Sequence, residues 1–242
     1  MKWIIVTGDS GGVGTAVTEE ILGNMKEYGV IGISRKFTER MQGFQDKYSH
    51  RYHHIDFDLS DSDGIRDMFR TRIRPLGHVF GLVNNAANAY DDIVTNFQLD
   101  PLRSMFSINV FSGMMLTKFV IRDMLVTRTK GVLVHVSSVS AHTGYKGLSA
   151  YAATKGAIEA FSLGVSREWG SYGIRSNVVA PGFMETSISG KLADEQRRKI
   201  YQRTSLKQAT QVKSVAKTIV FLLSGAASSI TGAVLAVDNG TV

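Results

Sequence analysis

The sequence predicts an α/β fold, a doubly wound Rossmann fold in which a seven-stranded parallel sheet carries helices on both faces. Two observations predict it. Short apolar runs alternate with longer segments of helical periodicity along the whole chain. The apolar runs also lack the polar alternation of half-exposed strands, which is typical of strands buried on both faces. Because no repeat, low-complexity segment or linker composition interrupts the 242 residues, we expect one domain over residues 1–242.

The individual elements follow from these patterns in chain order. The expected strands are Lys2–Thr7, Val30–Ser34, Tyr52–Phe57, Val79–Asn84, Gly131–Ser137, Ile174–Val179 and Ala233–Val237. The expected helices are Val13–Tyr28, Phe37–Tyr48, Asp61–Arg74, Leu99–Thr127, Ser149–Gly170, Ile188–Gln202 and Val212–Leu223. Ser60 or Asp61 is expected to cap the third helix. Pro101 falls in the first turn of the fourth, where its missing N–H leaves no hydrogen bond unmade.

The charge balance is basic and limits the classes of partner. The chain has 28 lysines and arginines against 21 acidic residues, a net charge of +7. This balance permits anionic cofactors, nucleic acid or an acidic protein partner. The basic residues are scattered, however, and the densest groups, within residues 66–74 and 197–203, fit solvated helix faces. Since no basic stripe is interleaved with aromatic residues, we do not expect nucleic-acid binding.

Composition also excludes several kinds of site. The chain has no cysteine, which rules out disulfides, thiolate metal ligands and cysteine nucleophiles. No expected helix carries a histidine pair at zinc spacing and there is no His-Glu-x-x-His motif, so no metal site is expected. The longest apolar runs are far shorter than the ~20 residues of a membrane span. The N-terminal run is too short for a signal peptide, and we expect a cytoplasmic protein that engages no membrane.

A glycine-rich loop follows the first expected strand and opens the first helix. Glycine permits a tight turn and lets backbone N–H groups approach a pyrophosphate, while the helix N-terminus adds partial positive charge. A plain strand–helix turn is the alternative, but this place between strand and helix is the one that a dinucleotide site requires. The expected cofactor contacts in this loop are Gly8, Ser10, Gly12, Val13 and Gly14.

The end of the second strand indicates which dinucleotide is bound. NAD sites place a carboxylate there, which accepts hydrogen bonds from the ribose hydroxyls. This chain instead has Ser34, Arg35 and Lys36, and two cations at this point would pair with a 2′-phosphate. We therefore predict that NADP(H) is preferred over NAD(H), with Ser34 and Arg35 in the site and Arg35 the main contact. An exposed basic loop is the alternative.

Tyr151 and Lys155 form a candidate acid–base pair. They are four residues apart in an expected helix and therefore share a face. An ammonium beside a phenol favours the phenolate, which would lower the pKa of Tyr151 from about 10 toward the working range of a general acid or base. Ser138 follows a buried strand, where its hydroxyl can donate a hydrogen bond to a substrate carbonyl oxygen.

Taken together, these motifs resemble the short-chain dehydrogenase/reductase family over essentially the whole chain. The resemblance rests on the Gly8, Gly12 and Gly14 spacing, on Asn84-Asn85-Ala86 after the fourth strand, on Ser138, and on Tyr151 with Lys155. It implies hydride transfer from the nicotinamide to a carbonyl carbon. It further implies that Tyr151 protonates the oxygen, that Ser138 positions and polarises it, and that Lys155 also holds the ribose hydroxyls. The resemblance assigns Asn109 to a water near the lysine and to a proton relay, although a purely structural role is open.

The resemblance implies further contacts around the cofactor. Asp58 and Leu59 would approach the adenine, unless Asp58 only caps the following helix. His142 lies where the family forms its pocket wall, and contact with substrate or a structural role are both open. The residues implied on the nicotinamide side are Asn84, Ala86, Pro181, Gly182 and Thr186.

Two positions depart from the family pattern. Ala87 stands where the family usually has glycine after Asn84-Asn85-Ala86. Asn239 replaces the first glycine of a common Asp-Gly-Gly sequence near the C-terminus. Asparagine tolerates positive φ better than most residues, so we expect this turn to persist.

Among subfamilies the chain most resembles the 3-oxoacyl-acyl-carrier-protein reductases of fatty acid biosynthesis, through the run over residues 176–186. This resemblance implies an acyl-thioester substrate, and an acyl carrier protein that could dock near Arg128 and Lys130. Reductases of other ketones, including sugar-derived and secondary-metabolite substrates, share the run, and the expected substrate loop over residues 183–203 does not identify the ligand. A protein that only senses NADP(H) is disfavoured, because binding alone needs no proton donor.

The resemblance also implies a homo-oligomer, a tetramer or a dimer. The helices that carry Asn109 and Tyr151 would pack against their copies. Apolar residues on these helices could serve that interface or the core of one subunit: Phe106, Val110, Phe111, Phe161 and Val165.

Overall fold

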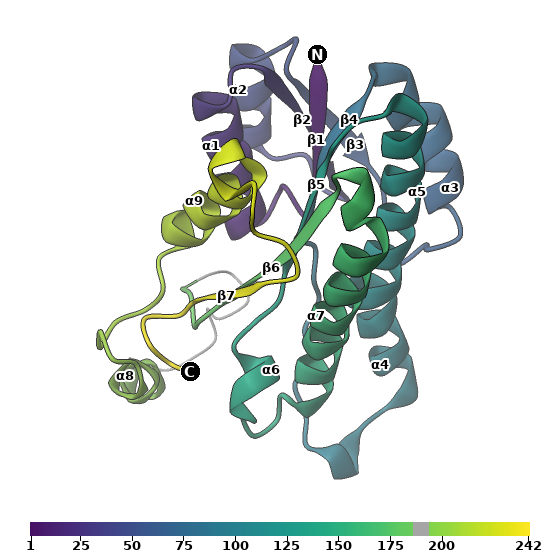
Figure 1. The fold of residues 1–242 in the computed structure, drawn as a ribbon. Helices are drawn as coiled ribbons and strands as arrows, with labels where there is room; N and C mark the ends of the chain where they lie inside the picture. The colour runs from purple at the N-terminus through teal and green to yellow at the C-terminus, as the bar shows by residue number, and fades with distance from the viewer. Residues whose placement is uncertain (186–193) are drawn as a thin grey trace.

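Seven parallel strands form one sheet through the middle of the protein (Figure 1). The structure is a computed structural model, and it describes residues 1–185 and 194–242. The strand order is β3-β2-β1-β4-β5-β6-β7, which confirms the predicted doubly wound fold. The strands are β1 (Lys2–Thr7), β2 (Tyr28–Ser34), β3 (Tyr52–Asp56), β4 (Val79–Asn84), β5 (Val132–Val136), β6 (Arg175–Pro181) and β7 (Val234–Val237).

Helices cover both faces of this sheet. The α-helices are α1 (Gly12–Asn24), α2 (Glu39–Lys47), α3 (Ile65–Met68), α4 (Leu99–Phe106), α5 (Ser112–Thr127), α6 (Ser140–Thr143), α7 (Ser149–Trp169), α8 (Asp194–Arg203) and α9 (Val212–Leu223). Turns of π-helix at Phe69–Ile73 and Ser107–Phe111 continue α3 and α4, and 3₁₀ turns lie at Arg74–Leu76, Val94–Asn96, Gly170–Tyr172 and Gly225–Ala227. α1, α2 and α9 lie on one face, whereas α3, α5 and α7 lie on the other (Figure 1).

Each face of the sheet has its own buried apolar cluster. Ile4 packs toward α1 and α9, in a cluster with Ile21 and Ile219. Its neighbour Ile5 packs in the opposite cluster, with Leu116 of α5. Successive side chains of a strand point to opposite faces, so a strand covered on both sides must be apolar at every position. This is why the runs that predicted the strands show no polar alternation.

Two helix ends differ from their predicted positions. The first helix was expected to reach Tyr28 but ends at Asn24, because β2 begins at Tyr28. The third was expected to begin at Asp61 with a cap at Ser60 or Asp61, and this prediction was wrong. The Asp61 carboxylate accepts a 2.9 Å hydrogen bond from the Gly64 N–H and stabilises the turn that precedes α3. The helix expected from residue 188 is described from residue 194 onward, as α8.

The longest helical run covers residues 99–127 as expected, with a π-helical turn in its middle. By length and composition this run could cross a membrane, but half of its most apolar window is buried inside the protein. That burial is what a core helix of an α/β fold shows. The π turn, Ser107–Phe111, carries Asn109, and such turns often occur at functional sites.

The turn near the C-terminus keeps the geometry of a glycine turn. Asn239 has φ 58° and Gly240 has φ 76°, so the asparagine adopts the left-handed conformation that we expected it to tolerate. The Asp238 carboxylate accepts hydrogen bonds from the backbone N–H groups of Gly240, Thr241 and Val242.

Candidate active site

A cavity of about 930 Å³ lies at the carboxyl ends of the strands, at the point between the paired strands β1 and β4 where the strand order reverses. Its volume falls within the range of cofactor sites. Most of the residues predicted from the sequence line it: Gly8, Ser10, Gly12, Val13, Ser34, Arg35, Asp58, Leu59, Ala86, Ser138, Tyr151, Lys155, Pro181 and Gly182. Gly14, Asn84 and Asn109 do not, and Thr186 lies outside the described residues.

The glycine loop is closely packed at Gly8 and Gly14. Gly8 has φ +70°, and a Cβ on Gly14 would lie 2.2 Å from the Gly8 carbonyl oxygen. Gly11 caps α1 without a side-chain hydrogen bond, and the first turn of that helix has no acidic residue. Its N–H groups therefore remain available to an anion, which a helix N-terminus favours. This cradle fits the pyrophosphate of a dinucleotide.

Arg35 and Asp58 stand together at the end of the cavity beside β2. The Arg35 Nη1 lies 3.5 Å from the Asp58 Oδ2. The Ser60 backbone N–H donates to Asp58, and this hydrogen bond, aided by Arg35, holds the pKa of that carboxyl below its usual value. Asp58 therefore both stabilises the turn at Ser60 and lines the cavity. Arg35 is largely exposed, so its guanidinium can reach an anionic ligand.

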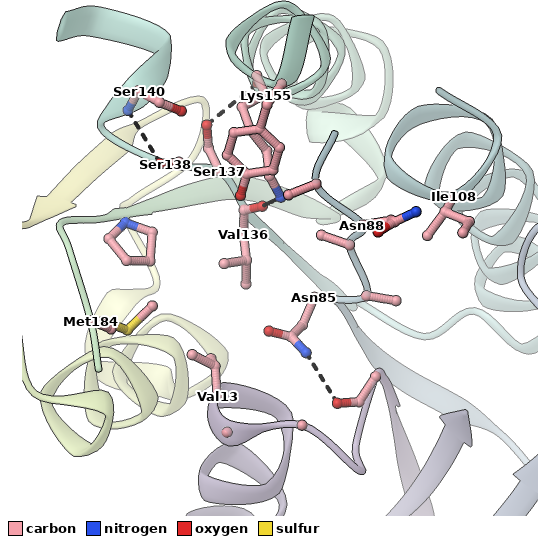
Figure 2. Close-up of a pocket in the computed structure, with 18 of the residues that line it drawn as sticks. Val13, Asn85, Asn88, Ile108, Val136, Ser137, Ser138, Ser140, Lys155 and Met184 are labelled. Atoms are coloured by element: carbon pink, nitrogen blue, oxygen red, sulfur yellow. Dashed lines mark hydrogen bonds between the residues drawn. The ribbon is translucent and has the colours of Figure 1, made fainter. Parts of the chain in front are cut away.

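Tyr151 and Lys155 lie one turn apart on α7, as predicted. The Lys155 Nζ lies 5.5 Å from the centre of the Tyr151 ring and donates a 2.9 Å hydrogen bond to the Val136 carbonyl oxygen (Figure 2). Burial lowers the pKa of Lys155 to about 8. Burial, together with the negative charge of Asp91, raises the pKa of Tyr151 to about 12.

The expectation that Lys155 lowers the pKa of Tyr151 is therefore wrong for this structure. Removing a phenol from water disfavours its charged form, and here this effect and the Asp91 carboxylate outweigh the ammonium. Tyr151 is consequently held as a neutral phenol at physiological pH. That is the form that can donate a proton to a substrate oxygen.

Ser138 is the second residue after β5, beside Ser137 and close to α6 (Figure 2). Its Oγ accepts a 3.2 Å hydrogen bond from the Ser140 N–H, within the same turn. Accepting this bond leaves the hydroxyl proton free to be donated into the cavity that Tyr151 and Lys155 also line.

Asn109 bridges two elements instead of lining the large cavity. Its Nδ2 donates to the Asn88 carbonyl oxygen and to Thr154 Oγ1, and its Oδ1 accepts a 2.7 Å hydrogen bond from the Asn88 N–H. With Lys155 and Asn84 it surrounds a separate space of about 10 Å³, close to the room that one water needs. The Asn84 Oδ1 is buried there without a protein hydrogen-bond partner among the described residues. The site thus fits the water that the family resemblance assigns to Asn109.

Asn84 was predicted to line the nicotinamide side, and it does not line the large cavity but the small space beside Lys155. Its amide donates to the Gly113 carbonyl oxygen and to Thr117 Oγ1, both on α5. Asn85, which sequence reasoning missed, lines the cavity (Figure 2). Its amide donates to the Thr7 carbonyl oxygen. The alternation of side chains along a strand places neighbouring residues on opposite sides, and this signal could have separated the two asparagines.

His142 also does not line the cavity. Its Nε2 lies 3.0 Å from the Glu159 Oε2, which fits the structural role and not the contact with substrate. Asp91, Tyr145, Lys146 and Arg203 also line the cavity. The first three come from loops and were not predicted, whereas Arg203 ends α8 and lies within the expected substrate loop over residues 183–203.

Comparison with known proteins identifies the family. A family model described as enoyl-(acyl carrier protein) reductase matches residues 8–242. A solved structure of a short chain dehydrogenase/reductase family protein has a TM-score of 0.86 and 26% sequence identity, and the match covers 99% of this chain and 96% of that one. The chain belongs to the short-chain dehydrogenase/reductase family.

Two further relatives extend this family assignment. The 3-oxoacyl-acyl-carrier-protein reductase FabG of Haemophilus influenzae is 30% identical over 241 residues, which are 99% of this chain and 97% of that protein. The structure of ElxO with NADP bound has a TM-score of 0.88 and 26% identity, and the match covers 99% of this chain and 98% of that one. As a family member, the chain is an NAD(P)-binding oxidoreductase that acts on CH–OH groups.

Proposed function

We propose that the protein is an NADP(H)-dependent reductase that converts a carbonyl to a secondary alcohol, and that its substrate is a 3-oxoacyl group on an acyl carrier protein. The observation that carries the reaction is the joint presence of Ser138, Tyr151 and Lys155 in one cavity, with Arg35 at its other end. The similarity to 3-oxoacyl-acyl-carrier-protein reductase supports the substrate.

In this mechanism each protein group has a defined role. Bound NADPH supplies the hydride. The Ser138 hydroxyl donates a hydrogen bond to the carbonyl oxygen, and the neutral Tyr151 phenol donates its proton to that oxygen as negative charge develops there. Lys155, one turn along α7, holds the ribose hydroxyls and offsets the charge left on Tyr151. A water held in the small space that Asn84, Asn109 and Lys155 line would return a proton to the site.

Two basic residues of the cavity lining support an anionic substrate. Lys146 and Arg203 line the cavity, and the Arg203 guanidinium lies 5.9 Å from the centre of the Tyr145 ring. Stacking on an aromatic face holds a guanidinium in place while its N–H groups stay free to donate. A thioester carried on phosphopantetheine has a phosphate at the far end of its arm, and these two cations can pair with it.

The direct test is to mix purified protein with NADPH and a short 3-oxoacyl thioester and to follow the loss of reduced-cofactor absorbance. We expect oxidation of NADPH and an equal amount of 3-hydroxyacyl product. If NADPH binds but no thioester is reduced, the substrate proposal fails, and a panel of ketones and keto-sugars tests the alternative carbonyl substrates. If NADPH does not bind, the proposed reaction itself fails.

The cofactor preference gives a separate prediction for Arg35→Ala. Losing a charge-assisted contact to the 2′-phosphate should weaken NADPH binding by about 20-fold and leave NADH binding nearly unchanged. Titration of each cofactor against protein fluorescence measures both affinities. Arg70→Ala, an exposed arginine that does not line the cavity, is the matched control. An equal loss for both cofactors would contradict the assignment of Arg35.

We further propose that the protein is cytoplasmic and acts as a homotetramer or a dimer. Of the five candidate interface residues, Val110 and Val165 are buried within the subunit and belong to its interior. Phe111 is 50% exposed on the long helix, and Leu163 is 49% exposed on α7. Exposed large apolar side chains on these two helices support their packing against a second copy.

A further inference from the structure

α7 carries a third polar residue on the face that bears Tyr151 and Lys155. Glu159 follows Lys155 by four residues, as Lys155 follows Tyr151, so the three side chains share one side of the helix. The Glu159 side chain is only 12% exposed. A carboxylate is rarely buried to this extent unless hydrogen bonds or a cation satisfy it.

Two residues satisfy the Glu159 carboxylate, and they flank Ser138 in the sequence. The Ser137 hydroxyl, which is buried, donates a 2.6 Å hydrogen bond to the Glu159 Oε1. The His142 Nε2 lies 3.0 Å from the Glu159 Oε2. One carboxylate therefore holds both ends of the turn that runs from β5 into α6 and presents Ser138 to the cavity.

The arrangement is not a hydrolytic triad. In a serine hydrolase, histidine stands between the serine and the carboxylate and takes the hydroxyl proton. Here the carboxylate stands between Ser137 and His142, and it receives the Ser137 hydrogen bond itself. The hydrogen bond thus fixes the position of the Ser137 hydroxyl and does not activate it as a nucleophile.

Ser138 depends on this support for its distance from Tyr151. Its Oγ bonds to the Ser140 N–H in its own turn, which does not link it to α7. The link to α7 comes from the residues on either side through Glu159, from the Lys155 Nζ on the Val136 carbonyl oxygen, and from a longer 3.4 Å contact of the Ser137 hydroxyl with the Lys155 carbonyl oxygen. Figure 2 shows Val136, Ser137 and Ser138 in sequence beside Lys155. A displacement of about 1 Å between reacting groups can cost about 10²-fold in rate.

We propose that Glu159 and His142 are a positioning pair for Ser138, which they hold at its working distance from Tyr151 by tying the turn over residues 137–142 to α7. This inference rests on the proposed reductase function and goes beyond it, because neither residue touches the cavity. Their loss should disturb the chemical step and leave the cofactor site, which lies beside β1 and β2, intact.

The test compares Glu159→Ala and Glu159→Gln with Glu168→Ala, an exposed carboxylate on the same helix. For Glu159→Ala we expect kcat to fall by about 20-fold, with NADPH affinity unchanged. Glutamine can still accept from Ser137, so Glu159→Gln should recover most of the rate. The Glu168→Ala control should match wild type. Unchanged kcat in Glu159→Ala, or a parallel loss of NADPH affinity, would overturn the proposal.

Hydrogen–deuterium exchange gives a readout that does not depend on turnover. In Glu159→Ala the backbone amides of residues 138–142 should exchange faster than in wild type, while those of residues 151–155 keep their rate. Ser137→Ala and His142→Ala should each give part of the same increase, which covers the case that Glu159→Ala fails to fold. Unchanged exchange in these variants would overturn the positioning role. A wild type that binds NADPH and reduces no carbonyl would instead refute the proposed function.

Discussion

Tyr151→Phe is expected to lower kcat for carbonyl reduction by about 10³-fold, with little change in NADPH affinity. The substitution removes one hydroxyl and leaves a ring of nearly the same shape, so the packing of α7 should persist. The oxygen that gains negative charge on hydride transfer then lacks its proton donor, because Ser138 donates a hydrogen bond to it but keeps its own proton. Stopped-flow measurement of NADPH oxidation, beside a fluorescence titration of NADPH, separates the rate from the affinity.

The pH dependence of wild type and mutant tests the same assignment. The pKa of Tyr151 is raised to about 12, so the neutral phenol that donates the proton is present at every pH below that value. Reduction should therefore not depend on the titration of Tyr151 and should decline only as Lys155, whose pKa is about 8, loses its proton, whereas oxidation of the alcohol, which needs the phenolate, should rise with pH. Tyr151→Phe should abolish this rise. A mutant that keeps wild-type rates would show that another group supplies the proton.

The fold was predictable because its determinants are local. The central strands consist of consecutive apolar residues, and Ile4, Ile5 and Val6 can serve only a sheet that is covered on both sides. The start of α3 was not predictable in the same way. Asp58, Ser60 and Asp61 all suit a helix cap, and the choice between them depends on how the chain leaves β3. Several polar residues in succession leave a helix start ambiguous by about a turn.

The site was predictable where spacing alone brings groups together. Tyr151 and Lys155 share a helix face, and the glycine loop needs only the order of strand, turn and helix. The pKa of Tyr151 was not predictable, since it depends on burial and on Asp91, which lies in a loop 60 positions earlier in the chain. The roles of Asn109 and Glu159 likewise depend on hydrogen-bond partners in other segments of the chain, which the sequence does not reveal.

Gly14→Ala is expected to weaken NADPH binding by about 10²-fold, although the residue does not line the cavity. An alanine Cβ would lie 2.2 Å from the Gly8 carbonyl oxygen and 2.7 Å from its carbon, and these are backbone atoms that cannot rotate away. Either α1 or the turn at Gly8 must move, and the turn presents the N–H groups that face the pyrophosphate. Overpacking of this kind also costs about 1–3 kcal/mol of folding stability.

Gly23→Ala on the same helix is the matched control for the loss at Gly14. Gly23 is exposed, and nothing lies within 4 Å of the Cβ that alanine would add. Alanine is the better helix former, so this variant should be as stable as wild type or slightly more stable, with unchanged NADPH affinity. Thermal unfolding with and without NADPH measures both effects, because a bound ligand raises the Tm. If Gly14→Ala still shows the full shift with NADPH, then the close contact between α1 and the turn is not what shapes the phosphate site.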